Sequence, residues 1–450
     1  MNYYELLKKW GNVQPEKTLL TVDEENWSYG DMLARVSKLS QDLAAGLLPS
    51  LYQGSVLVEA SGAATQMAAF LALQAVKIRP ILLHHGLTPQ EKAAILQENQ
   101  LQGILKVHQD LTGQFDWSIY ATKQDSPVHT AEDILGVLSS GSTGVPKVMY
   151  RTYASWAGFF PVQNEIFHIR QDSRLFFHGN LSFTGNLNAV LGVLYAGGSL
   201  ITSRTFHCRQ WEILLERNRA DVIYLLPTKL QLLTASTKGS WPLVRTIFTG
   251  SQMMSHCHIQ NVKAAFPQAE LIIYYGASEL NYITYTICKG EKRDSRNLGR
   301  PFPGIGLSVR DGIIYVDTPY HVSGLAKPFT VRDTGWLNEK GELIFTGRRE
   351  AWINKGGVKI SIQHLENELQ EITGIEQAAV IPCPDALRGN NIAAFLVKDT
   401  AIAESTIRRA IRQNLKPVEI PEKITFLTQL PLNDRGKVDR RQLIAQCQQK

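Results

Sequence analysis

The chain has 450 residues, of which 44% are apolar and 20% are charged, and its formal net charge at pH 7 is +6. This length suits two domains with a large core, and the composition is that of an ordinary globular protein rather than a disordered or fibrous one. The mild positive charge suits small anionic substrates, and no basic run with interleaved aromatic residues predicts a groove for nucleic acid.

The elements expected in chain order alternate between strand and helix. Strands are predicted at 55–59 and 79–83, on either side of a helix at 63–76, and the alternation continues through 101–270. Parallel sheets covered by helices follow from this pattern. After residue 347 the pattern changes to a helix at 361–369, strands at 378–382 and 392–397, and a helix at 404–415. We therefore predict an α/β fold with a large N-terminal domain, 1–348, and a small α+β C-terminal domain, 349–450.

The cysteines predict a cytoplasmic protein. They stand at positions 208, 257, 288, 383 and 447, an odd number without a Cys-x-x-Cys pair, which is typical of reduced thiols. The first ten residues suggest an amphipathic helix rather than a signal peptide, and the apolar stretch at 189–201 is too short to span a bilayer. His256 and His258 lie two residues apart and point to different sides of a helix, so we expect the surface start of a helix there and no metal site.

The most informative segment is 138–147, Leu-Ser-Ser-Gly-Ser-Thr-Gly-Val-Pro-Lys, which follows a predicted buried strand at 134–138. Its two glycines let the backbone turn and expose N–H groups beside four hydroxyls, an arrangement that can hold phosphate oxygens. The common P-loop is excluded, because Pro146 precedes the lysine and Val148 follows it. A Gly/Ser-rich turn between two strands is the lesser alternative for the segment taken alone.

Three further motifs follow in order. They are Ile-Ile-Tyr-Tyr-Gly-Ala-Ser-Glu at 272–279, Val-Arg-Asp-Thr-Gly-Trp and Glu-Lys-Gly-Glu-Leu-Ile-Phe-Thr-Gly-Arg within 331–348, and Pro-Leu-Asn-Asp-Arg-Gly-Lys-Val-Asp-Arg at 431–440. Together with the first segment, they resemble the ordered motifs of the ANL superfamily of adenylating enzymes. That superfamily includes acyl-CoA and aryl-CoA synthetases, adenylation domains of peptide synthetases, and luciferases. The four motifs span most of the chain.

The resemblance implies a nucleotide site. Phosphate contacts fall to the first segment, with Thr143 also catalytic: Ser139, Ser140, Gly141, Ser142, Thr143, Gly144 and Lys147. The second motif supplies the adenine and α-phosphate contacts: Tyr274, Tyr275 (stacked on adenine), Gly276 and Ser278 (on the α-phosphate). Glu279 is expected to act in catalysis by holding Mg²⁺, which prefers carboxylate and phosphate oxygens. Gly250 and Ser251, at the end of a strand predicted at 244–250, are expected along the adenine.

The third motif is assigned to the ribose. Asp333 is expected to accept hydrogen bonds from the ribose hydroxyls, and Arg348 to donate to the ribose or a phosphate. Arg332 stands where the family usually has glycine, and it either touches a phosphate or, as we favour, points to solvent.

The resemblance also implies a mobile C-terminal domain. Lys437 is its catalytic lysine, because a cation is needed where carboxylate and α-phosphate meet. Glu350 falls at the hinge, and Gly356 and Gly357 are expected to line the tunnel for a thiol.

The implied reaction is that of an ATP- and Mg²⁺-dependent acyl-CoA ligase, which forms acyl-AMP and then a thioester with CoA. Two alternatives stay open: transfer to an acyl carrier protein, and a catalytically inactive nucleotide-binding scaffold. The oligomeric state also stays open.

The acyl pocket is assigned to His178, Phe183 and Thr249. No Asp or Glu occurs from 173 to 211, which argues against an α-amino acid substrate, and no Lys or Arg occurs from 175 to 203 to pair with a second carboxylate. We therefore expect an uncharged fatty or aryl acid of open chain length. The leucines and valine at 187, 190, 191 and 194 follow helical spacing and are expected in the core.

Overall fold

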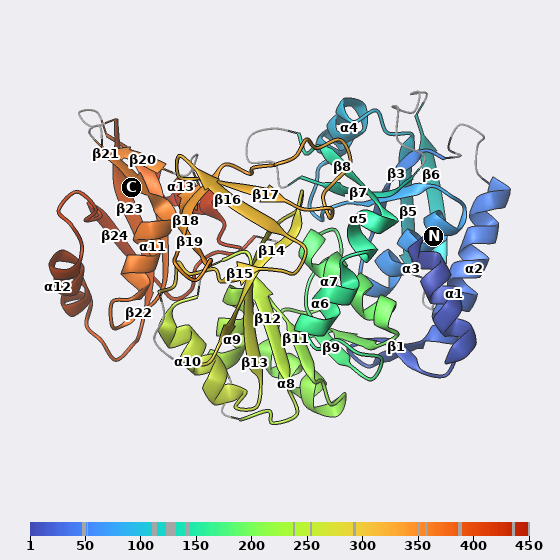
Figure 1. Ribbon diagram of the computed structural model, residues 1–450, viewed down its shortest axis with the longest axis horizontal. Helices are drawn as coiled ribbons and strands as arrows, with labels where there is room; N and C mark the ends of the chain where they lie inside the picture. Colours follow the sequence, from blue (N-terminus) through green and yellow to red (C-terminus); the bar gives the residue numbers. More distant parts are fainter. Residues whose placement is uncertain are drawn as a thin grey trace.

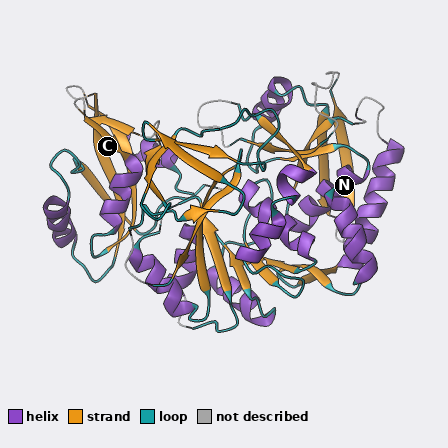
Figure 2. Cartoon of the chain, viewed as in Figure 1, coloured by secondary structure: helices purple, strands orange, loops and turns teal. Residues whose placement is uncertain are grey.

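The computed structural model describes residues 1–46, 51, 53–109, 115–122, 132–139, 145–236, 239–252, 254–290, 294–348, 352–355, 358–385, 389–433 and 437–448. In these residues the chain forms a large N-terminal part and a smaller C-terminal part beside it (Figure 1). Strands lie between layers of helices in both parts (Figure 2). The predicted α/β class is confirmed.

The largest sheet is mainly parallel and carries helices on both faces. Its spatial order is β15 (Arg300–Pro301), β14 (Asn281–Cys288), β13 (Glu270–Ala277), β12 (Thr246–Gly250), β11 (Val222–Tyr224), β9 (Arg174–Phe177), β10 (Ser199–Thr202), β1 (Thr18–Val22) and β2 (Glu25–Ser28). The run from β13 through β1 is parallel throughout. Parallel strands place all their carboxyl ends at one edge of the sheet, which is where ligands bind in open α/β folds.

Side-chain alternation along these strands divides the core in two. Phe176, Ile223 and Ile247 face one way and pack with α8 (Cys208–Arg217), α9 (Pro227–Ser236) and α10 (His256–Ala265). Their chain neighbours Phe177 and Tyr224 face the other way, in the main core that includes α7 (Thr184–Ala196). This alternation follows from the two-residue period of a strand. The α7 positions 187, 190, 191 and 194 are all buried, as predicted.

A second sheet, also with a parallel centre, lies toward the N-terminus. Its order is β6 (Phe115–Ala121), β5 (Gly103–Gln109), β3 (Ser55–Ala60), β4 (Arg79–Leu82), β7 (Asp133–Leu138) and β8 (Val148–Thr152). The predicted strands around residues 55 and 79 and the helix between them are β3, β4 and α3 (Ala63–Ala75), and each end lies within one residue of the prediction. The other helices on this side of the N-terminal part are α1 (Tyr3–Val13), α2 (Tyr29–Gly46), α4 (Pro89–Glu98), α5 (Tyr153–Ala157) and α6 (Phe160–Ile166).

Two smaller sheets complete the chain. The first is antiparallel: β16 (Gly306–Arg310), β17 (Ile313–Asp317), β18 (Asp333–Leu337) and β19 (Leu343–Arg348). The second is the C-terminal sheet: β21 (Val358–Ser361), β20 (Trp352–Lys355), β23 (Gly389–Lys398) and β22 (Ile375–Asp385), with β24 (Lys423–Leu427) paired to β23. It packs with α11 (Ile362–Gln370), α12 (Glu404–Asn414) and α13 (Arg440–Gln448). The domain boundary near 348–349 stays a prediction, because residues 349–351 lie outside the described part.

Two sequence expectations meet the structure here. The helix α10 begins at His256 as expected, but His258 is buried and contacts Gln231 at 2.6 Å instead of lying at the surface. Among the described residues, no helix has both the length and the apolar character to cross a membrane.

Gly250 is required by packing at the end of β12. A Cβ placed on it would lie 2.6 Å from the carbonyl oxygen of Tyr274 and 2.6 Å from its ring. We expect Gly250→Ala to destabilise the protein by about 1–3 kcal/mol, the usual cost of overpacking a core. The measurement is the free energy of unfolding in urea. Gly306→Ala is the control, since its Cβ would meet its nearest atom at an ordinary 3.5 Å. Equal stability of the two variants would contradict the packing argument.

Candidate active site

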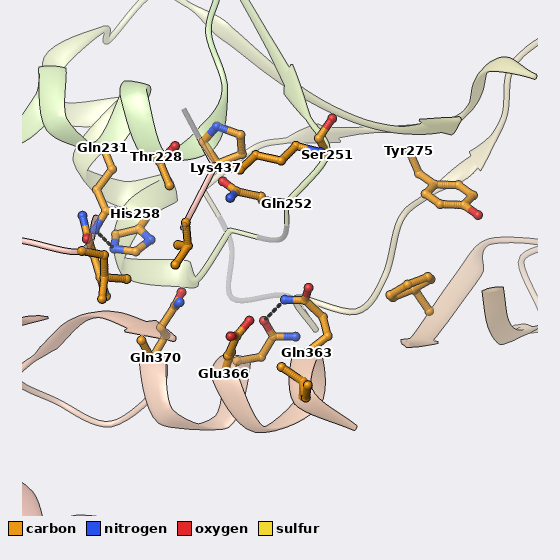
Figure 3. A pocket seen from close by; sticks show the side chains of 18 of the residues that line it. Thr228, Gln231, Ser251, Gln252, His258, Tyr275, Gln363, Glu366, Gln370 and Lys437 are labelled. Carbon is orange, nitrogen blue, oxygen red and sulfur yellow. Dashed lines mark hydrogen bonds between the residues drawn. The ribbon is translucent and has the colours of Figure 1, made fainter. Parts of the chain in front are cut away.

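A cavity of about 490 Å³ lies where β12, β13, the β16–β19 sheet and the C-terminal domain meet. Its lining includes Ser251, Gln252, Tyr274, Tyr275, Gly276 and Asp333 from the N-terminal part, and Gln363, Glu366 and Lys437 from the C-terminal domain. Figure 3 shows Ser251, Gln252 and Tyr275 on one side of the cavity and Gln363 and Glu366 on the other, with Lys437 extended toward Ser251. Residues predicted from motifs far apart in the sequence thus border one space.

Tyr275 and Asp333 form the polar wall of this cavity. The Tyr275 hydroxyl donates to Oδ2 of Asp333 at 2.6 Å, and Asp333 is only 1% exposed. A buried carboxylate is stabilised by such charge-assisted hydrogen bonds. The register of β18 and β19 pairs Asp333 with Arg348, whose backbone alone is described. The structure therefore brings both predicted ribose-binding positions to one place.

Tyr274, the neighbour of Tyr275, has a different environment. It is 5% exposed, its hydroxyl lies 3.0 Å from that of Tyr224, and burial raises its pKa well above the ordinary value. Its ring packs in the main core, and the residue also contributes to the cavity lining. Strand alternation explains the difference, because consecutive side chains point to opposite faces.

The phosphate segment is described only at its two ends, and residues 140–144 lie outside the described part. Ser139 donates from its backbone nitrogen to the Lys147 carbonyl at 2.8 Å, and its hydroxyl accepts from the Lys147 nitrogen at 2.9 Å. β7 and β8, which these residues connect, are antiparallel. The segment is therefore a strand-to-strand connection, and its predicted phosphate contacts remain predictions.

Arg151, which the sequence analysis did not single out, holds the second motif in place. It is fully buried on β8 and donates to the carbonyl oxygens of Ser278 at 2.7 Å and Tyr320 at 3.1 Å. Burial lowers its pKa to about 10, against the opposing effect of Tyr3 and Glu279. The Ser278 hydroxyl meanwhile accepts from Thr184 at 3.2 Å. The sequence feature that could have indicated this role is a charged residue within a short strand directly after the phosphate segment.

The lysine segment is fixed to its own domain by an ion pair between a half-buried arginine and a buried glutamate. Arg440 contacts Oε1 of Glu366 at 2.5 Å, and the same oxygen accepts from the Val380 nitrogen at 2.8 Å. Burial raises the pKa of Glu366, and Arg440 opposes that shift. Closer to the lysine, the Asn433 nitrogen donates to the Lys437 carbonyl at 2.8 Å. These contacts link the lysine segment to α11 and β22.

A second cavity, of about 340 Å³, adjoins the first and shares Thr228, Leu430 and Asn433 with it. Lys229 lies in its wall, only 4% exposed, and donates to the carbonyl oxygen of His178 at 2.9 Å and to Nδ1 of that histidine at 3.1 Å. Burial lowers the pKa of Lys229 to about 8. This lysine lies outside the range 175–203, where the sequence shows no cation, because it belongs to a different element, α9.

The three predicted acyl-pocket residues are separated. His178 borders the second cavity. Phe183 stacks on His84 with ring centroids 5.0 Å apart, and Thr249 is fully buried and donates to the Leu225 carbonyl at 2.6 Å. Their joint role in binding the acyl group stays a prediction.

The remaining predicted positions are the hinge, the thiol tunnel and Arg332. Glu350, Gly356 and Gly357 lie outside the described residues. Arg332 is exposed and has a φ of +60°, a left-handed conformation that glycine adopts most readily. This backbone conformation explains why the family usually has glycine at this position.

Comparisons with known proteins identify the family. The family model for the AMP-binding enzyme matches residues 7–318, and that for the AMP-binding enzyme C-terminal domain matches 364–437. The chain belongs to the AMP-binding enzyme family. It is thus a member of the ANL superfamily and an AMP-forming acid–thiol ligase.

Individual relatives are distant. The uncharacterized acyl-CoA ligase YhfT of Bacillus subtilis is 29% identical over 67% of this chain and 66% of its own. The putative long chain fatty acid-CoA ligase VraA of Staphylococcus haemolyticus is 24% identical over 96% of this chain and 95% of its own. Among solved structures, ATP-bound MatB from Rhodopseudomonas palustris has a TM-score of 0.81 at 20% identity, covering 99% of both chains. The o-succinylbenzoate CoA synthetase MenE of Bacillus subtilis has a TM-score of 0.80 at 18% identity, covering 97% of both. These two likenesses show the fold.

Tyr275→Phe tests the polar wall. The family binds a nucleotide, and loss of the Tyr275 hydroxyl removes the donor that orients Asp333. We expect the Kd for ATP to rise by at least about 10-fold, since a hydrogen bond to a charged group contributes roughly 1.5–3 kcal/mol. Isothermal titration calorimetry measures this value. Tyr315→Phe, on β17 outside the cavity lining, is the control. An unchanged Kd in a stably folded Tyr275→Phe protein would refute the assignment.

Proposed function

We propose that the protein is an ATP-dependent acyl-CoA ligase, which activates a carboxylic acid as acyl-AMP and transfers the acyl group to CoA. The observation that carries the proposal is the shared cavity, bordered by Tyr275 and Asp333 from one domain and Lys437 from the other. The names of YhfT and VraA support the acyl-CoA ligase class. The alternative of an inactive scaffold is disfavoured, because Lys437 borders the same cavity as Tyr275 and Asp333, the positions predicted for adenine and ribose.

The first half-reaction joins two anions. The substrate carboxylate attacks the α-phosphorus of ATP, an acyl-phosphate bond forms, and pyrophosphate leaves. In our proposal Lys437 reduces the repulsion between carboxylate and phosphate, and its ammonium stabilises charge that builds in the transition state. Asp333 and Tyr275 hold the nucleoside so that the reacting atoms stay aligned.

Mg²⁺ fits the residues present. Mg²⁺ is usually bound by one or two carboxylates together with phosphate oxygens and water. Among the described residues no group of three or more His, Cys, Asp and Glu side chains forms a metal cage. Glu279, whose backbone carbonyl accepts from the Val322 nitrogen at 2.9 Å, would contribute one carboxylate. The ion would neutralise phosphate charge when bound.

The second half-reaction replaces AMP by a thiol. In our proposal the C-terminal domain turns at Glu350, and Gly356 and Gly357 then line the path of the pantetheine arm. No specific contact distinguishes CoA from a carrier protein as the acceptor, so this choice is tested by adding CoA to enzyme charged with acyl-AMP. Formation of free thioester would support CoA.

Lys437→Ala tests the proposal. We expect carboxylate-dependent ATP–pyrophosphate exchange to slow by at least ~10²-fold, the scale for losing one electrostatic donor at a transition state. Thioester formation from supplied acyl-AMP should largely survive, because that step needs no cation at the departing pyrophosphate. Lys416→Ala, an exposed lysine of the same domain, is the control. Equal losses of rate in both half-reactions of Lys437→Ala would contradict the role of Lys437 in the first half-reaction alone. Absence of exchange with every acid in the wild type would contradict the proposed activity.

A further inference from the structure

The second cavity holds a buried positive charge. It lies at the carboxyl ends of β9 and β11, which are adjacent parallel strands. His178 directly follows β9, and Lys229 lies in the first turn of α9, shortly after β11. Gly179, with a φ of +128°, leaves room for the ammonium, since a Cβ there would lie 3.2 Å from the Lys229 Nζ.

The hydrogen bonds leave this charge available to a ligand. A lysine ammonium has three donors, and two of them reach His178, at its carbonyl oxygen and its Nδ1. An Nδ1 that accepts places the histidine proton on Nε2, so the ring is neutral and does not balance the charge. No salt bridge among the described residues involves Lys229, although a buried ammonium is costly unless it is paired. A bound anion would satisfy both the third donor and the charge.

We propose that Lys229 binds a second carboxylate at the far end of the substrate acid, so that the enzyme's substrates are dicarboxylic acids. This inference rests on the proposed function and names its substrate class. It differs from the expectation of an uncharged acid, which rested on the absence of Lys and Arg between residues 175 and 203.

The cavity's other wall points to the acid rather than the thiol. That wall comes from Leu430, Leu432 and Asn433, in the segment that carries Lys437. The cavity is therefore complete in the same arrangement that presents Lys437 to the nucleotide site. Acid activation is the step that needs this lysine, so the ligand that shares the arrangement is the acid.

Strand spacing limits the substrate's size. Ser251 follows β12 beside the first cavity, and His178 follows β9 beside the second, with β11 between them. Two strand spacings amount to roughly 10 Å. A compact diacid with its carboxylates at about this separation fits better than a long alkyl chain.

The experiment compares matched acids in ATP–pyrophosphate exchange without CoA. The panel pairs straight-chain dicarboxylates with monocarboxylates of equal length, and aryl diacids with their monoacid counterparts. We expect the wild type to prefer a diacid in kcat/KM. Lys229→Met should lower kcat/KM for that diacid by at least ~10-fold, the scale for losing a charge-assisted hydrogen bond, and leave the monoacid unchanged. Lys229→Arg should retain the preference, and the exposed Lys340→Met is the control.

The outcomes separate the two proposals. Exchange with monoacids and no preference for any diacid would overturn the carboxylate site while leaving the ligase intact. Equal loss for both acids in a Lys229→Met protein of unchanged thermal stability would also overturn it. If exchange is unchanged in Lys229→Met and only the KM for CoA rises in the complete reaction with CoA, the charge would belong to a phosphate of the acceptor, against the proposal. Absence of exchange with every acid would overturn the ligase function itself.

Discussion

The parallel arrangement of β9, β11, β12 and β13 is the constraint on which the candidate site depends. Parallel strands end at the same edge, so segments separated by long helical crossovers finish side by side. His178, Lys229, Ser251 and Tyr275 all lie at or just beyond such strand ends. The backbone hydrogen bonds of the sheet therefore set the spacing of the site before any side chain acts.

The C-terminal domain supplies the second wall of the cavity that begins at the edge of the sheet. Its lysine segment is anchored by the Arg440–Glu366 ion pair, and a contact from Gln231 to the Glu376 carbonyl at 2.9 Å crosses between the domains. A polar contact of this kind suits an interface that must separate and re-form. In the proposed cycle, the ion pair keeps Lys437 in a fixed place on its domain while the domain itself moves.

Two buried cations show how the same chemistry serves different ends. Arg151 donates to backbone carbonyls, has Glu279 as a charged neighbour, and stacks near Trp156 at 5.1 Å. Its charge is stabilised by the segment that it holds in place, which contains Ser278 and Glu279. Lys229 contacts a neutral histidine and a backbone carbonyl, lies 6.0 Å from the centroid of the Phe206 ring, has no carboxylate partner among the described salt bridges, and borders a cavity. A charge that the protein itself does not balance is the stronger indication of a ligand.

Sequence alone determined the family, the α/β class and most strand and helix positions, because local periodicity and short motifs carry that information. It also named Tyr275, Asp333 and Lys437, whose motifs are contiguous along the chain. Tertiary structure decided which faces these residues share. Tyr274 entered the core by strand alternation, Arg151 reached the Ser278 carbonyl from a strand far away in sequence, and Lys229 met His178 across two neighbouring strands. Such contacts depend on which strands pair in the sheet, and that pairing is a property of the fold rather than of any local pattern.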